Sequence, residues 1–321
     1  MLHLNSSTIA IGQTPPQDMG GLWDTRQFQG TFPPFPNLSK VRVIVTPNFN
    51  TAWDPSKPGA APVCIITELS AANFTAQATN TSEQGTSGPT LSLNWLAIEE
   101  VAPTATLPIN VRMGLTIPQF YVPQHFPQSN EGWWQQTSPS FASPLRGEQT
   151  TVLLTPTDPF GSFKHSAAIA GTVHKPGSSG FQMAGISTDS ATGACAFNYV
   201  AAAAIAGSDQ PTLIVDTGEV TSAEFPPPDN GPGNNLRWFS LGIPFTRRFD
   251  APPIVLVTAS SVGLPSPPPP VVALVSHVTD DYFILNTRYT HTGSGFIQPA
   301  NFFWVAIGCN AGCGQGPGKV P

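Results

Sequence analysis

An aromatic motif recurs three times in this chain at almost constant spacing, and this repeat limits the folds that the chain can adopt. Three apolar segments end alike: Leu91–Ile98, Ala194–Ala202 and Ala300–Ile307. Their aromatic anchors Trp95, Tyr199 and Trp304 are 104 and 105 residues apart. A fixed period of this kind indicates tandem copies of one structural unit.

Further landmarks precede each anchor in the same order. Apolar runs stand at Val41–Pro47, Thr151–Pro156 and Ile254–Ala259, and Phe-centred segments follow at Phe74, Phe181 and Phe283. The openings Leu2–Leu4, Leu107–Val111 and Leu213–Val215 agree less closely. We therefore divide the chain into a first copy (1–103), a second, divergent copy (104–209), a third copy (210–309) and a Gly-rich tail (310–321).

Each copy predicts an all-β structure. Runs of four to eight residues alternate apolar with polar positions or are wholly apolar, and Pro, Gly, Asn and Ser bound them. The segment Ser92–Ile98 shows the period of two that places one face of a strand in a core. The alanine run Ala201–Ala206 is too short for a stable isolated helix. Antiparallel β-sandwiches fit this pattern.

Charge and hydropathy exclude several classes of protein. A net charge of -6 with 13 Lys and Arg residues is unsuited to a basic surface for nucleic acid. No run of 18 apolar residues predicts membrane insertion. Residues 1–8 do not resemble a secretory signal, so either the protein is cytosolic or its signal has been removed. The low charge and the many prolines instead favour a secreted, extracellular protein. Four glycosylation sequons, at Asn5, Asn37, Asn73 and Asn80, are close to the number expected by chance.

The cysteines are too few for a disulfide framework, and we expect no cofactor and no metal site. Cys309 and Cys313 either close a small disulfide loop or stay reduced, and the sequence leaves both open. A zinc site there would need two more ligands that the tail does not supply. Cys64 and Cys195 stand in apolar runs, which predicts buried thiols.

Sequence signatures of enzymes are missing. The chain has no Gly-x-Ser-x-Gly, His-Glu-x-x-His, Walker-type or Gly-x-Gly-x-x-Gly motif. Glu99 and Glu100 are adjacent, so on a strand their carboxylates would point to opposite faces and would not act together on one bond. We therefore expect a protein without catalytic activity.

The motifs together resemble the H-type lectin domain, a small six-stranded antiparallel sandwich. In the third copy the resemblance lies in Ile243–Val257, Val271–Phe283 and Phe303–Ile307. In the first copy it lies in Phe32–Phe35, Val41–Thr46, Phe74 and Asn94–Ile98. Because domains of this family form trimers with sugar sites near the protomer contacts, the resemblance implies an intramolecular pseudo-trimer. Such a compact body would also account for the low charge.

The resemblance also implies a sugar site built from an early-loop carboxylate, an arginine on the strand before the Phe-centred one, and a Trp-His pair after it. The arginine position falls at Ile65 in the first copy and Leu274 in the third, and Ala168–Val173 of the second contains no arginine. The Trp-His positions hold Thr81–Ser82, Thr188–Asp189 and Thr290–His291. Only His291 matches the family.

Two groups of residues are candidates for ligand binding. The cluster Arg288, Tyr289 and His291 combines hydrogen-bonding and aromatic side chains, although a plain surface loop is the alternative. Trp133 and Trp134 could form an aromatic platform for a sugar. Trp23 and Trp238 occupy similar places in the other copies. A packing role shared by all copies is therefore the alternative for at least one of Trp133 and Trp134. Three early-loop acids could replace the family's carboxylate: Asp24, Glu131 and Asp229.

Two functions follow. The first is a non-enzymatic carbohydrate-binding protein that engages glycans or glycoproteins multivalently, as in cell adhesion. The second is a structural or assembly protein whose lectin-like sandwiches have lost the sugar site and mediate protein contacts or self-association. The residues do not name the sugar or the oligomeric state.

Overall fold

The computed structural model describes residues 2–3, 9–49, 60–82, 90–99, 109–116, 133–145, 150–158, 169–187, 196–204, 213–226, 238–261, 271–289 and 300–309. These residues form strands, loops and two short 3-10 helices, Leu38–Lys40 and Ser222–Glu224. The predicted all-β class is confirmed. No helix in these ranges is long and apolar enough to cross a membrane.

Strands occupy the described part of the apolar runs that the sequence singled out. The first copy holds β1 (Leu2–His3), β2 (Ile9–Gln13), β3 (Thr25–Thr31), β4 (Val41–Phe49), β5 (Pro62–Leu69), β6 (Asn73–Asn80) and β7 (Leu91–Glu99). The second holds β8 (Ile109–Thr116), β9 (Trp133–Thr137), β10 (Thr150–Thr157), β11 (Ile169–Gly177), β12 (Gly180–Ser187) and β13 (Ala196–Ala204). The third holds β14 (Leu213–Val220), β15 (Phe239–Pro244), β16 (Ile254–Ser261), β17 (Val271–Ser276), β18 (Tyr282–Tyr289) and β19 (Asn301–Cys309). The expected copy boundaries and the tail lie outside the described residues.

Three sheets contain these strands, and each sheet combines two copies. Their strand orders are β1-β2-β7-β4-β17-β18-β15, β3-β6-β5-β10-β13-β8 and β14-β19-β16-β11-β12-β9. Where two copies meet, the pairs β4·β17, β5·β10 and β11·β16 are parallel, whereas pairing within each copy is antiparallel. The sheets are thus mixed, unlike the antiparallel sheets predicted for each copy alone. Pairing across copies covers strand edges that would otherwise expose unpaired N–H and C=O groups.

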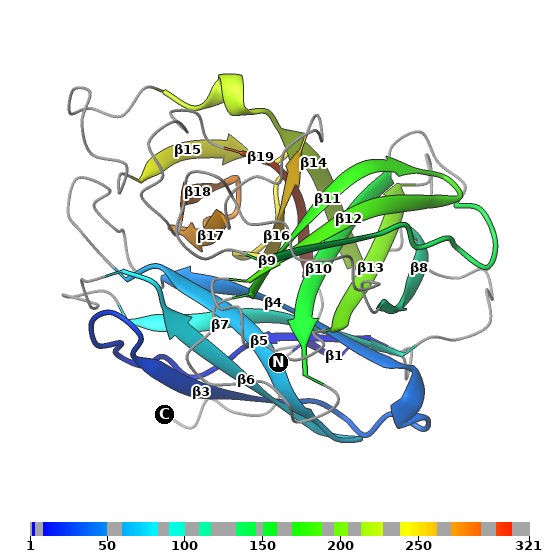
Figure 1. The fold of residues 1–321 in the computed structure, drawn as a ribbon. Coiled ribbons are helices and arrows are strands. Elements are labelled where there is room, and N and C mark those ends of the chain that lie inside the picture. Colours follow the sequence, from blue (N-terminus) through cyan, green and yellow to red (C-terminus); the bar gives the residue numbers. More distant parts are fainter. Residues whose placement is uncertain are drawn as a thin grey trace.

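Apolar side chains form one cluster around each copy and a fourth between them, and Figure 1 shows the strands of the copies as three groups (blue to cyan, green, and yellow to red). The fourth cluster takes equivalent residues from all three copies, among them Ile44, Leu153 and Leu256. Strand β7 explains why no alternation is visible in the burial of the central strands. Trp95 packs in the first-copy cluster and Leu96 in the fourth, so both faces of the strand are buried.

A closed ring of three hydrogen bonds joins β4, β10 and β16. The Thr155 hydroxyl accepts the Val45 N–H at 3.0 Å, the Thr258 hydroxyl accepts the Leu154 N–H at 2.9 Å, and the Thr46 hydroxyl accepts the Val257 N–H at 3.0 Å. All three threonines are at most 4% exposed. Each copy therefore supplies one hydroxyl acceptor and one backbone N–H donor. As a result, each of these three buried N–H groups has a hydrogen-bond acceptor.

The position before each anchor has diverged between copies. Asn94 donates to the Val255 carbonyl at 2.9 Å, and Asn198 donates to the Val43 carbonyl at 3.2 Å. The third copy has Phe303 there, and its ring packs in the second-copy cluster instead. Two of the contacts between copies are therefore polar at this position and one is apolar.

The anchors are large aromatics because each ring covers a glycine on the neighbouring strand. Trp95 lies opposite Gly12, Tyr199 opposite Gly114 and Trp304 opposite Gly218. A Cβ at any of these glycines would stand 2.6 Å from the nearest atom of the aromatic side chain. These glycines show that β2, β8 and β14 are the equivalent first strands of the three copies. The prediction that the first copy begins with a matching strand at Leu2–Leu4 was therefore wrong. Instead, β1 pairs outside β2.

Candidate functional site

The structure describes the predicted site residues unequally. Arg288 and Tyr289 end β18, and Trp133 and Trp134 begin β9, but only the side chain of Arg288 is described. His291 lies outside the described residues, as do the acids Glu131 and Asp229. Arg288 and the early-loop acid Asp24 are therefore the predicted candidates whose contacts can be followed.

The arginine positions implied by the resemblance are buried between copies. Ile65 is 4% exposed and packs in the second-copy cluster, and Leu274 is fully buried in the first-copy cluster. In the second copy, strand pairing puts Thr172 at this place, because it lies opposite Ala184 as Leu274 lies opposite Asn286. Each position at which the resemblance implies an arginine therefore holds a packed, uncharged side chain.

Arg288 on β18, the strand next to that of Leu274, places a guanidinium at the contact between the third and first copies. It is 3% exposed, and on β18 it shares a face with Asn286, the cross-strand partner of Leu274. Its Nη1 donates to the Ser82 hydroxyl of the first copy at 3.4 Å, and its Cζ lies 5.4 Å from the Trp238 ring centroid. Burial lowers the pKa of Arg288 to about 10, so the side chain still carries its charge at neutral pH.

The tryptophans before the second strand of each copy do not share one role. Trp238 is 5% exposed and packs in the first-copy cluster, which confirms the packing role for this residue. Trp23 is 44% exposed, so the packing role is wrong for it. Strand pairing explains the difference: Trp238 adjoins Phe239, the partner of Thr287, and corresponds to Thr25 rather than Trp23. By the same register Trp134, opposite Ile186, corresponds to Trp238.

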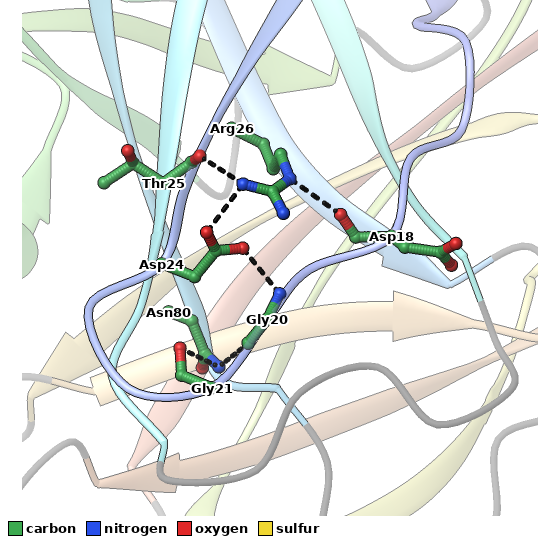
Figure 2. A network of polar contacts seen from close by, with 7 residues as sticks. All are labelled: Asp18, Gly20, Gly21, Asp24, Thr25, Arg26 and Asn80. Atoms are coloured by element: carbon green, nitrogen blue, oxygen red, sulfur yellow. Dashed lines mark hydrogen bonds and ion pairs between the residues drawn. The ribbon is translucent and has the colours of Figure 1, made fainter.

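The loop that presents Trp23 is held by polar contacts on both sides (Figure 2). Trp23 has a φ of 65°, a left-handed conformation that is strained for a side chain of this size. Asp24 accepts the Gly20 N–H at 2.5 Å and pairs with Arg26 at 2.6 Å, while Arg26 also donates to the Asp18 carbonyl at 3.0 Å. Asp24, which the sequence offered as a sugar carboxylate, is thus engaged within its own loop.

Asn80 at the end of β6 is the second support of this loop, and it is fully buried. Its Nδ2 donates to the carbonyls of Gly20 at 2.7 Å and Gly21 at 3.1 Å, as Figure 2 shows. Its Oδ1 accepts the N–H groups of Ala61 at 2.8 Å and Ser82 at 2.9 Å. The Asn80 side-chain amide, to which a glycan would be attached in this sequon, therefore already makes four hydrogen bonds within the fold.

The segment 80–82 connects the two features. Asn80 supports the exposed Trp23 through the loop, and Ser82 two residues later contacts Arg288. An exposed, preorganised aromatic ring suits stacking on the apolar face of a sugar, and a guanidinium suits hydrogen bonding to oxygen acceptors. Sequence reasoning missed Trp23 because its signal, a left-handed φ, exists only in the folded loop.

The cysteines have no part in this candidate site. Cys64 is a partly buried free thiol that packs against the first-copy cluster, and desolvation raises its pKa. Cys309 ends β19, whereas Cys195 and Cys313 lie outside the described residues. In the described ranges no three His, Cys, Asp or Glu side chains gather where they could hold a metal ion.

Comparison with known proteins adds no relative to this description. No protein family model matches the chain, and neither a curated protein nor a solved structure is significantly similar to it. The resemblance to H-type lectins therefore stays a prediction carried by the sequence motifs.

Proposed function

We propose that the protein is a non-enzymatic carbohydrate-binding protein in which three lectin-like copies form an intramolecular pseudo-trimer. The threonine ring and the shared sheets support the pseudo-trimer, because each copy contributes equivalent residues to the contacts with both others. Linking the copies in one chain removes the association entropy that separate subunits would lose.

The observation that carries the binding function is the strained, exposed Trp23. A left-handed tryptophan persists only where surrounding contacts determine it, and such strain gathers at functional sites. Asp24 and Asn80 supply those contacts. A ring held in place before the ligand arrives loses little side-chain entropy on binding, which favours stacking on a sugar face.

A glycan array tests this proposal with the purified wild-type chain, Trp23→Ala and Leu115→Ala. Leu115 is a matched control because it is also an exposed apolar residue, at 40%, on a strand of the second copy. We expect wild type and Leu115→Ala to bind the same glycans and Trp23→Ala to bind them at least about tenfold more weakly. A blank array for the wild type would refute the proposal.

A structural or assembly role is the second candidate, and the buried Ile65 and Leu274 favour it. These apolar residues occupy the places where the resemblance implies a sugar-binding arginine. Self-association through exposed apolar residues such as Leu22 and Trp23 would then replace glycan binding. Sedimentation at increasing protein concentration separates the candidates: growing oligomers that Trp23→Ala abolishes support assembly, and a monomer supports the lectin.

A further inference from the structure

Arg288 is a buried cation that lacks an anionic partner in the described part of the chain. Its closest polar contact is the long Nη1 hydrogen bond to the Ser82 hydroxyl, at 3.4 Å. Its Nε is buried and has no acceptor. A guanidinium that leaves water without a carboxylate loses hydration that neither a neutral hydroxyl nor an aromatic ring fully replaces.

The contact with Ser82 leaves the buried Nε edge of the guanidinium without an acceptor. Nη1 faces Ser82, and the opposite edge presents the Nε–H beside Nη2, two nearly parallel donors. Trp238 covers one face of the planar group and fixes its orientation. Two parallel N–H donors in a fixed plane match the two oxygens of a carboxylate.

We propose that Arg288 binds the carboxylate of an acidic saccharide, in the contact between β18 of the third copy and the Asn80–Ser82 segment of the first. This proposal rests on the carbohydrate-binding function above and names its ligand class, a uronic or similar sugar acid. The carboxylate supplies the acceptor that Nε lacks and the negative charge that the buried cation lacks.

Strand register predicts one such site in each chain. Counting from the Phe of each Phe-centred strand, Arg288 corresponds to Thr79 on β6 and Ile186 on β12. Neither side chain carries a charge. Binding of a sugar acid through a guanidinium at this position is therefore expected with a stoichiometry of one.

Isothermal titration of the full chain with sodium glucuronate tests the proposal, with glucose and sodium sulfate as comparison probes. Wild type should bind one glucuronate, bind sulfate more weakly and show no heat with glucose. Arg288→Met should lose at least about tenfold in affinity, and Arg288→Lys, which keeps the charge but not the two-donor edge, should fall between them. Arg248→Met is the matched control, because Arg248 is exposed and already pairs with Asp280.

The outcomes separate this inference from the function on which it rests. Glucuronate binding that Arg288→Met leaves unchanged, or no binding to wild type, overturns the carboxylate site. No glucuronate binding, together with a glycan array that responds to neutral sugars through Trp23, overturns the site and leaves the carbohydrate function standing. Arg288-dependent glucuronate binding with an array that is blank for neutral sugars supports the site and overturns the binding role proposed for Trp23. Circular dichroism verifies the fold of each variant, and Arg288→Lys keeps the test decisive if Arg288→Met does not fold.

Discussion

Replacing Thr155 with valine breaks one hydrogen bond in the threonine ring and leaves the side-chain shape almost unchanged. The Val45 N–H, which donates to Thr155 at 3.0 Å, would remain buried without an acceptor. An unsatisfied buried amide costs about 1–3 kcal/mol. Thr155 is 1% exposed, so water has no ready access to replace the lost contact. We expect the free energy of unfolding to fall by about 1–3 kcal/mol.

Thr151→Val on the same strand is the matched control. Thr151 is also 1% exposed, but its hydroxyl has no hydrogen-bond partner, so its removal should leave stability unchanged or raise it. Equilibrium urea unfolding of both variants and wild type measures the difference through the transition midpoint at constant m-value. Equal stability of Thr155→Val and Thr151→Val would refute the energetic role of the ring.

Three further predictions concern single sites. Gly12→Ala should destabilise the fold by about 1–3 kcal/mol, because its Cβ would meet the Trp95 ring. Gly242→Ala is the control and should be tolerated, because no atom lies within 4 Å of a Cβ there. Thermal melting compares the two variants. Asn80→Ala should cost roughly 2–4 kcal/mol in urea unfolding, since four side-chain hydrogen bonds are lost, two of them buried and two part-buried; a cost under about 1 kcal/mol would contradict that accounting. Without ligand, Arg288→Met should be as stable as wild type or more stable by up to about 2 kcal/mol, because it removes an uncompensated buried charge; a marked loss in melting temperature would mean that the charge has a partner.

The strands themselves could be predicted because strand formation depends on local patterning. The apolar runs and the anchors Trp95, Tyr199 and Trp304 lie on strands where the period placed them. The opening of the first copy could not be placed correctly, because the glycine that marks it, Gly12, is meaningful only opposite the Trp95 ring. That contact joins residues far apart in sequence.

The candidate site was partly within reach of the sequence. Arg288 was selected for its polar neighbours, yet its burial against Ser82 and Trp238 depends on a contact between copies. Trp23 and Trp238 were treated as equivalent positions, but a two-residue difference in strand register separates them, so that Trp238 is buried and Trp23 is exposed. A register shift of this size leaves no trace in composition.

The sequence by itself determined the all-β class, the three-part period and the positions of the central strands, since alternation and spacing are properties of the chain alone. Only the tertiary structure decided that each sheet combines two copies and that Thr46, Thr155 and Thr258 close a ring. The reason is that pairing partners are chosen by unpaired strand edges and buried amides. These exist only once the copies have met, and no local pattern encodes them.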